Sequence, residues 1–432
     1  MKLGFKKYGI FLLFIDIILW TTMASTPLTE QLGTPVILLQ IFSALLYFPF
    51  GVIILWKLVQ DLRDLRKNWL NGIYYLFAAY YCVLTVIRFI NGMEAKESIY
   101  YAVVIIGSLA LYLQIHDGRL AMDREAYSLN FRWILIFMIG YKIIATILAT
   151  GAFGIPRIIG NPPVNNLYST SVLTILLPFM VDSLRKQKEN KITVEAILLY
   201  LAIILMATCL SRAIFFLSAL VLAGLFVVKI TDFVLVKRTA IVVLCAVLTV
   251  GVLAAADVGN VRYALYREIG LFGAPAVDPT DPSETVPDDK EDVYEQIERS
   301  DDMRSELLKL GIAEAGKNPL FGTGDLYYTY DLGYKTMEQT AHNFLVEAIV
   351  SFGAVGTLML AAILLLILKN CGLLAGALRK NWQDRIYCMA AICYYFVFGL
   401  VQPSVFNTLL CPVFLVVLAY YGTVLIQSHS DQ

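Results

Sequence analysis

The sequence has little charge for its length. Only 16% of its 432 residues are Asp, Glu, Lys or Arg, whereas roughly a quarter of an average soluble domain is charged. Basic and acidic residues balance to a formal net charge of zero, so the bulk charge indicates no nucleic-acid partner. Hydrophobic residues make up 59% of the chain, in runs long enough to cross a bilayer. This composition excludes an ordinary soluble domain and predicts a polytopic membrane protein.

The sequence also lacks the short motifs of many enzyme classes. It contains no P-loop, dinucleotide fingerprint, HExxH or GxSxG element, and no internal repeat. The seven cysteines all fall in or beside apolar runs, without metal-ligand spacing or a disulfide framework, and we interpret them as small buried hydrophobes. We therefore predict neither a metal nor a cofactor.

The apolar runs predict an all-α fold with about twelve transmembrane helices. Nine lie in residues 1–256 and three in residues 342–432, and residues 257–341 form one large outer loop with short helices. Within that loop, residues 275–302 are rich in proline and acid and are predicted to form a solvated linker. The predicted spans are 8–26, 35–57, 70–90, 98–116, 131–151, 167–184, 192–210, 213–233, 239–256, 342–368, 385–401 and 405–426.

Lysine and arginine gather in alternate loops, which predicts the orientation. With the N-terminus in the cytoplasm, the cytoplasmic segments hold most of these cations, and the short outer loops hold few. Both termini are then cytoplasmic and the large loop faces outward. Asp16 interrupts the first apolar run, which we interpret as an uncleaved anchor rather than a signal peptide. The cations of the short outer loops are Arg88, Lys96, Arg157 and Arg212.

Three residues are candidates for chemistry at the outer surface. His342 begins the tenth predicted span, where the helix dipole favours a neutral imidazole that can accept a proton, although a lone histidine can also be a simple cap. Arg212 lies in a very short turn between two spans, and its planar fork suits phosphate, although it can also reach lipid headgroups. Arg304 lies in the first turn of a predicted loop helix with Met303, Leu307 and Leu310 on one stripe.

Other polar residues give weaker signals. Tyr327, Tyr328 and Tyr330 are possible glycan contacts, but tyrosines near a bilayer also form interfacial belts. No spacing selects a catalytic pair among Asp325, Asp331 and Glu338. Asp16 and Lys142 lie inside two spans at similar depths, where an ion pair or a proton pathway would be possible.

The order of these elements resembles the O-antigen ligase and O-antigen polymerase superfamily of bacterial envelope enzymes. The resemblance is carried by LSRAIFF (210–216), MRSELLKLGIAEAGKNPLFGTG (303–324) and HNFLVEAIVSFGAVG (342–356), and it covers the C-terminal half of the chain. It implies glycan transfer from a polyprenyl-pyrophosphate carrier to an acceptor hydroxyl, without a metal, at the outer face of the bacterial cytoplasmic membrane.

The resemblance also implies roles for single residues. Arg212 and Arg304 would hold the pyrophosphate leaving group, and His342 would act as general base on the acceptor hydroxyl. Asn343, Gly322, Gly324 and Glu347 would support the site. Gly353 and Gly356 lie in a small-residue patch that we expect to admit a neighbouring helix closely.

Three functions stay open at this stage. We favour a polymerase that joins lipid-linked repeat units over a ligase that transfers polymer to a lipid A core. A chain-length regulator is a candidate partner of such a polymerase. The alternative from another class is a flippase for lipid-linked oligosaccharides that uses Asp16 and Lys142. The His342–Asn343 pair argues against peptidoglycan polymerases, whose usual catalytic residue is an acid in the large loop.

Overall fold

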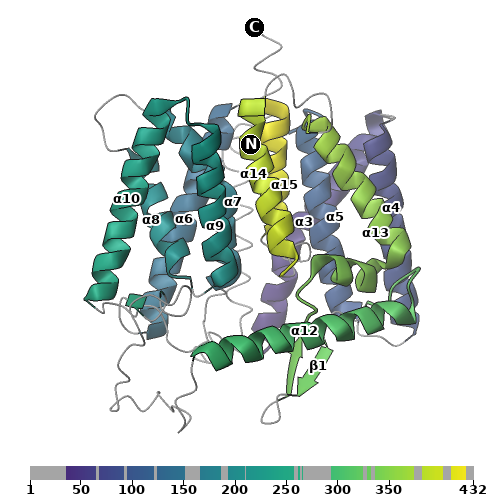
Figure 1. Cartoon of the computed structure of the whole chain (residues 1–432). Helices are drawn as coiled ribbons and strands as arrows, with labels where there is room; N and C mark the ends of the chain where they lie inside the picture. The colour runs from purple at the N-terminus through teal and green to yellow at the C-terminus, as the bar shows by residue number, and fades with distance from the viewer. Residues whose placement is uncertain are drawn as a thin grey trace.

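The protein is a bundle of helices with one small hairpin (Figure 1). The computed structural model describes residues 36–64, 68–91, 95–120, 124–150, 166–185, 193–209, 211–256, 261–262, 265, 293–324, 328–331, 336–373, 382–401 and 410–424. The first group of helices comprises α3 (Val36–Asp64), α4 (Trp69–Ile90), α5 (Ala95–His116), α6 (Arg124–Thr150), α7 (Asn166–Arg185), α8 (Val194–Ala207), α9 (Arg212–Val228) and α10 (Phe233–Ala255).

The second group of elements carries the large loop and the last helices. It comprises α12 (Val293–Lys317), β1 (Tyr328–Asp331), β2 (Thr336–Gln339), α13 (Phe344–Asn370), α14 (Trp382–Gly399), α15 (Leu410–Ala419) and the π-helical turn η2 (Tyr420–Val424). The two strands pair antiparallel, with Thr329 opposite Glu338. Several helices begin where a short polar side chain accepts a backbone N–H, as Asn68, Thr193, Ser211 and Asp232 do for α4, α8, α9 and α10.

The apolar runs of the sequence were good predictors of these helices. Each predicted span from 35–57 onward corresponds to a helix, and the span 8–26 lies outside the described residues, as does Asp16. Three of the described helices, α4, α10 and α13, are long and apolar enough to cross a membrane, and the described residues contain six further apolar helical segments of 10–17 residues. The count of twelve spans stays a prediction, as does a pairing of Asp16 with Lys142, whose side chain is also not described.

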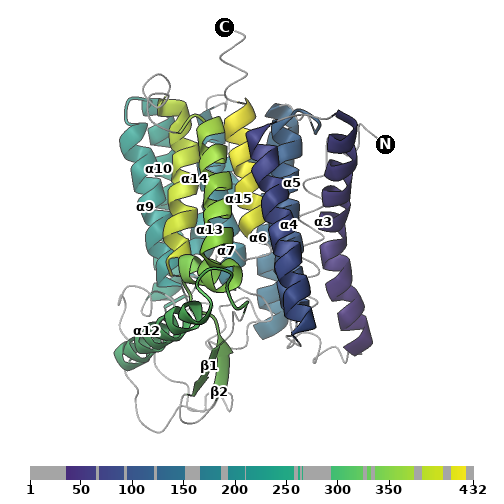
Figure 2. The ribbon, with the colours of Figure 1, turned by 90° about the vertical axis from the view of Figure 1, so that its right-hand side faces the viewer.

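Helix α12 lies across one end of the bundle, with the hairpin beside it (Figures 1 and 2). It begins at Val293, inside the stretch predicted to be a linker, so the end of that stretch is helical. Its half-buried Met303 and fully buried Leu307 pack against Ala341 and Val346, whereas Leu310, predicted on the same stripe, is exposed. The large loop is therefore anchored to the start of α13.

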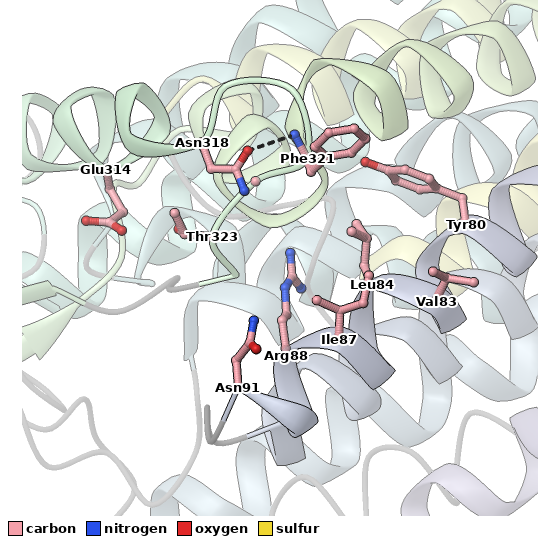
Figure 3. Close-up of a pocket in the computed structure, with 11 residues that line it drawn as sticks. Tyr80, Val83, Leu84, Ile87, Arg88, Asn91, Glu314, Asn318, Phe321 and Thr323 are labelled. Atoms are coloured by element: carbon pink, nitrogen blue, oxygen red, sulfur yellow. Dashed lines mark hydrogen bonds between the residues drawn. The ribbon is translucent and has the colours of Figure 1, made fainter.

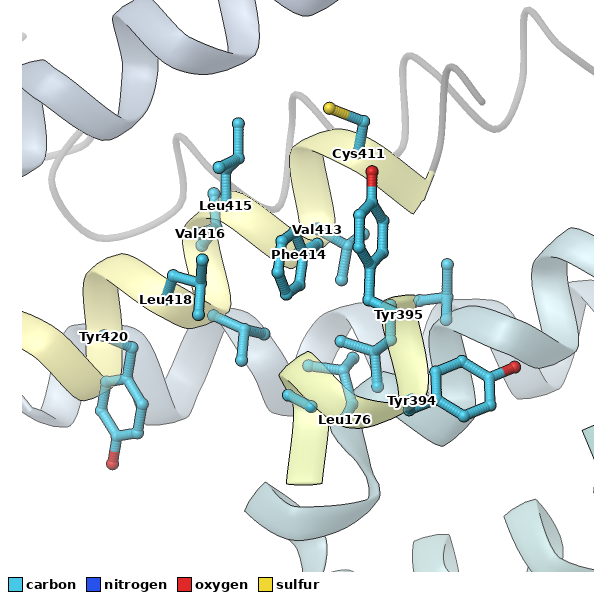
Figure 4. Close-up of a cluster of buried hydrophobic side chains, with 14 of the residues drawn as sticks. Leu176, Tyr394, Tyr395, Cys411, Val413, Phe414, Leu415, Val416, Leu418 and Tyr420 are labelled. Atoms are coloured by element: carbon cyan, nitrogen blue, oxygen red, sulfur yellow. The ribbon is translucent and has the colours of Figure 1, made fainter. Parts of the chain in front are cut away.

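The centre of the bundle is aromatic. Where α14 meets α15, the rings of Tyr395 and Phe414 stack with centroids 3.9 Å apart, among buried aliphatic side chains (Figure 4). Both helices also pack against α7, and α15 packs against α5, which connects the two halves of the bundle. Close packing of this kind supplies most of the attraction between helices in a lipid environment.

An ion network fastens the ends of α3 and α4. Lys57, which is fully buried, donates hydrogen bonds to Asp61 (2.7 Å) and Asn71 (2.9 Å), and Arg119 pairs with the same Asp61 carboxylate. The Tyr75 hydroxyl donates to Asp61 at 2.5 Å. Burial raises the pKa of Asp61, but the hydrogen bonds from Lys57, Tyr75 and Arg119 outweigh it and hold the pKa below its ordinary value.

We expect this network to make the fold sensitive to acid. A carboxylate whose pKa is lowered by folding stabilises the protein above its unfolded pKa of about 3.9, and this contribution is lost as the pH falls through the lower folded value. When the pH is lowered from 6 to 3, the unfolding temperature should therefore fall less steeply for Asp61→Asn than for the wild type. Glu306→Gln, which removes an exposed carboxylate of α12, is the control and should follow the wild-type curve. Parallel curves for all three proteins would contradict the assignment.

Candidate active site

The junction of the large loop with α13 lies at His342. Its φ of 51° is the one positive value at a non-glycine position among the described residues. Such a backbone is uncommon outside glycine and is often found where function requires it. The next residue, Asn343, caps α13 by accepting the N–H groups of Leu345 (3.0 Å) and Val346 (3.2 Å). The side chain of His342 is thus placed by a turn of defined geometry and is half-buried.

Glu347 is buried next to this turn. It is 1% exposed, and its carboxyl group lies near the hydroxyl of Thr340 and the backbone N–H groups of His342 and Asn343. Both carboxyl oxygens are buried and have no hydrogen-bond partner among the described residues. Its role as a supporting residue stays a prediction.

Arg304 belongs to α12, which packs against the segment around His342. The contacts of Met303 and Leu307 with Ala341 and Val346 pack the middle of this helix on the segment around His342. The prediction that Arg304 lies in the first turn of its helix was wrong, because α12 begins eleven residues earlier, at Val293. The Arg304 side chain itself is exposed. It can therefore approach a ligand that sits outside the His342 turn.

Arg212 is the first residue of α9, after the N-cap Ser211. Helix α9 packs along α14, and Cys209, just before α9, lies near the hydroxyl of Tyr394 in α14. Less than two helical turns further along, the Leu400 carbonyl accepts a hydrogen bond from the Asn343 amide at 3.3 Å. Helix α14 thus links the regions of Arg212 and His342, although direct contact among the two arginines and His342 stays a prediction.

The NPLFGTG loop, residues 318–324, interlocks with a break in α13. At Gly353 the backbone leaves the helical region (φ 65°, ψ −177°), so neighbouring backbone groups lose their helical partners. The loop replaces these partners in both directions. Thr323 and Gly324 donate N–H groups to the Val350 carbonyl at 2.8 and 3.0 Å, and the carbonyls of Pro319 and Leu320 accept from Ala354 (2.8 Å) and Val355 (3.2 Å).

The break divides α13 into two parts with different directions. Figure 1 shows the first part lying across the end of the bundle near α12 and the second part rising through it, and Figure 2 shows the first part nearly end-on. Gly322 and Gly324 have φ values of 74° and 88°, as expected for the sharp turn predicted from the sequence. Neither Gly322 nor Gly353 has room for a Cβ, because the loop and the helix backbone approach too closely.

Two side chains of α4 donate hydrogen bonds to backbone carbonyls beside the break in α13. The Arg88 guanidinium donates to the Ser351 carbonyl, and the Tyr80 hydroxyl donates to the Phe352 carbonyl at 2.6 Å. A Cβ on Gly356 would lie 2.6 Å from the Tyr80 ring, so α4 approaches α13 as closely as the predicted small-residue patch suggested. Sequence reasoning missed Arg88 as a site residue. The available signal was an arginine in the last turn of an apolar span, where a buried partner is usual.

A comparison with known families is informative for this part of the chain. Residues 196–361 match the family model described as O-antigen ligase. The predicted resemblance to the O-antigen ligase and polymerase superfamily is confirmed. No curated protein and no solved structure matches the chain.

The O-antigen ligase match covers all of the predicted site residues. Arg212, Arg304, the NPLFGTG loop, His342 and the break at Gly353 lie within it, whereas Arg88 lies outside. The family implies lipid-linked glycan substrates and an enzyme of the membrane glycosyltransferase type. Tyr327 and Asp325 lie outside the described residues, and for Tyr328, Tyr330, Asp331 and Glu338 only the backbone, in the hairpin, is described.

Proposed function

We propose that the protein is a glycosyltransferase that polymerises polyprenyl-pyrophosphate-linked oligosaccharide repeat units at the outer face of the bacterial cytoplasmic membrane. The observation that carries this proposal is the His342 turn at the start of α13, with Asn343 as the cap, Glu347 buried beside it and the helix of Arg304 packed against it. A base in this position can work on a hydroxyl group that arrives from the aqueous side while the lipid carrier stays in the bilayer.

In the proposed reaction, one glycosidic bond replaces one bond to phosphate. The acceptor hydroxyl oxygen attacks the anomeric carbon of the donor sugar, and His342 takes the hydroxyl proton. The bond from the anomeric carbon to the phosphate oxygen breaks, and the polyprenyl pyrophosphate leaves with the electron pair. Arg212 and Arg304 supply positive charge where negative charge develops on the leaving group, which is the kind of stabilisation with the largest effect in such transfers.

A ligase is the second candidate, because the matching family is described as O-antigen ligase. Both enzymes would use the same base and the same leaving group, and they differ in the acceptor. A polymerase extends a lipid-linked repeat unit, whereas a ligase transfers finished polymer to a lipid A core. A flippase would need no general base, so a product assay separates all three.

The purified protein in lipid nanodiscs should convert lipid-linked repeat units into a ladder of longer products on a gel. We expect the same ladder in the presence of a strong chelator, because two arginines can replace a metal at a pyrophosphate leaving group. A single transfer to an added lipid A core, without a ladder, would identify a ligase instead. Absence of any new glycosidic product would reject the transferase, and strong inhibition by chelator would reject the metal-free mechanism.

Replacement of Arg304 should impair transfer without affecting the fold. Its side chain is exposed on α12, so Arg304→Ala should unfold at the wild-type temperature while the rate of polymer formation falls about 100-fold, as expected for a lost charge-assisted contact of a few kcal/mol. Arg304→Lys should recover only part of the rate, because lysine cannot form a bidentate phosphate contact. The matched control is Lys309→Ala, also exposed on α12, which should keep wild-type activity. Equal rates for Arg304→Ala and Lys309→Ala would remove Arg304 from the site.

A further inference from the structure

A cavity of about 560 Å³ lies between α4 and the end of α12 with its following loop (Figure 3). None of His342, Arg212 and Arg304 lines it, so it is separate from the proposed catalytic site. Its volume is in the range of ordinary small-molecule sites. It is lined by Tyr80, Val83, Leu84, Ile87, Arg88, Asn91, Glu314, Asn318, Phe321, Gly322 and Thr323.

One side of this cavity is apolar and continues onto the outer face of α4. Val83 and Ile87 are 57% and 48% exposed, and α4 is one of the helices that can cross a membrane, so these side chains face the lipid. Phe321 contributes a further exposed aromatic ring from the loop, 48% exposed. A hydrocarbon chain can therefore enter the cavity sideways from the bilayer.

The other side is polar, and its charge is buried. Arg88 is 6% exposed and lies at the cavity wall, with Asn91 beside it and Asn318 and Thr323 across from it (Figure 3). The hydroxyl oxygen of Thr323 is buried without a hydrogen-bond partner among the described residues. The Glu314 carboxylate is paired with Lys317 at 2.5 Å, which reduces its repulsion of an anion. The polar wall thus offers one guanidinium, two amides and one unsatisfied hydroxyl.

An apolar wall next to a buried arginine fits an amphiphile with an anionic group at the end of its hydrocarbon chain. We propose that this cavity binds the pyrophosphate end of the lipid-linked acceptor, with the first isoprene units along Val83 and Ile87. The inference rests on the proposed polymerase function, in which donor and acceptor carry the same lipid. It assigns them to different places: the donor to the arginines near His342, and the acceptor to Arg88.

The difference in positive charge between the two sites agrees with this assignment. The phosphates of the donor gain negative charge during transfer and need strong stabilisation, whereas those of the acceptor do not change and only have to be held. A single arginine that also donates to the Ser351 carbonyl can hold an anion in this way. The same arginine contact joins the acceptor site to the first part of α13, which begins directly after His342 and Asn343.

The test uses a short polyprenyl pyrophosphate with a photoreactive group on its chain, applied to the full-length protein in zwitterionic nanodiscs. Cross-linked peptides are then identified by mass spectrometry. We expect labelling of residues 80–91 as well as of the His342 region. Excess unlabelled polyprenyl pyrophosphate should suppress the α4 label at least tenfold, whereas inorganic pyrophosphate or a polyprenol of equal length should compete weakly. Labelling needs no turnover, so its result is independent of whether a ladder of products forms.

Two valines of α4 provide a matched pair of variants. Val83 and Val86 are both 57% exposed, but only Val83 lines the cavity. Val83→Trp should reduce the α4 label at least tenfold and keep the label near His342, and Val86→Trp should keep both. Arg88→Gln, which retains a side-chain N–H donor without the charge, should also lose most of the α4 label.

Three results would overturn the proposal. The first is the absence of an α4 label in the wild type, and the second is an equal loss in the Val83→Trp and Val86→Trp variants. The third is competition by polyprenol as strong as that by polyprenyl pyrophosphate, which would mean a groove for hydrocarbon alone. If the labels behave as expected but no polymer forms, the polymerase function fails and the amphiphile site remains.

Discussion

Replacement of His342 by asparagine is expected to lower the rate of glycan transfer by about 10²–10⁴-fold, the usual contribution of a general base. Asparagine is the informative choice because His342 has a φ of 51°, and asparagine tolerates this left-handed backbone better than alanine does. The turn and the capping of α13 should therefore persist while the base is lost. The measurement is the initial rate of polymer formation from lipid-linked repeat units, together with the unfolding temperature.

The control for this variant is His116→Asn. His116 ends α5, and its ring nitrogen Nε2 lies 3.2 Å from the Asn370 amide at the far end of α13. We expect this variant to keep its rate of transfer. In cells, His342→Asn should let single lipid-linked repeats build up outside the membrane, whereas a defective flippase would trap them inside. Full-length polymer at the wild-type rate from His342→Asn would show that the base is another group.

The helices could be predicted from the sequence because their positions depend on a local property, the length of each apolar run. A run of about twenty apolar residues forms a helix in a bilayer, since all its backbone groups must then be satisfied within the segment. The helices α4 and α7 accordingly begin and end within a residue or so of the predicted spans 70–90 and 167–184. The boundary at Val293 could not be predicted in this way, because an acidic stretch of low apolarity gives no such signal.

The break in α13 could not be predicted from its own sequence. Gly353 lies within a continuous apolar run, and glycine is common in intact transmembrane helices. What decides the conformation is a loop about thirty residues earlier in the chain, whose carbonyl and N–H groups bond to Val350, Ala354 and Val355. The sequence indicated a sharp turn at Gly322 and Gly324 and close helix packing at Gly353, but not that these features meet.

The candidate site likewise has one part that could be predicted from the local sequence and one part that could not. His342, Asn343 and Glu347 are close in sequence, so a motif was sufficient to associate them, and the structure supplies the turn, the cap and the burial. Arg88 comes from a helix more than 200 residues earlier. Its relation to Ser351 depends on how α4 packs against α13, which no local pattern contains.

Gly353→Ala should be the most destabilising of the substitutions considered. A φ of 65° with a ψ of −177° is accessible in practice only to glycine, and any other residue there costs about 1–3 kcal/mol. The added Cβ would also overlap the carbonyl of Leu320. The loop must then move away, and each of its four hydrogen bonds to α13 contributes about 1 kcal/mol. The sum is a large part of the 5–15 kcal/mol that stabilises a typical protein.

The matched control is Gly251→Ala, since Gly251 lies within α10 and nothing lies within 4 Å of its added Cβ. This variant should unfold at or slightly above the wild-type temperature, because alanine favours helix over glycine by up to about 1 kcal/mol. Gly353→Ala should unfold many degrees lower and form no polymer, because the first part of α13 would no longer hold His342. A straight α13 is the alternative state, and wild-type unfolding temperature and activity in Gly353→Ala would mean that the protein works with that straight helix. The two glycine variants thus distinguish two roles of Gly353. In one, the break in α13 is required to position His342; in the other, α13 can be straight and the glycine is only tolerated.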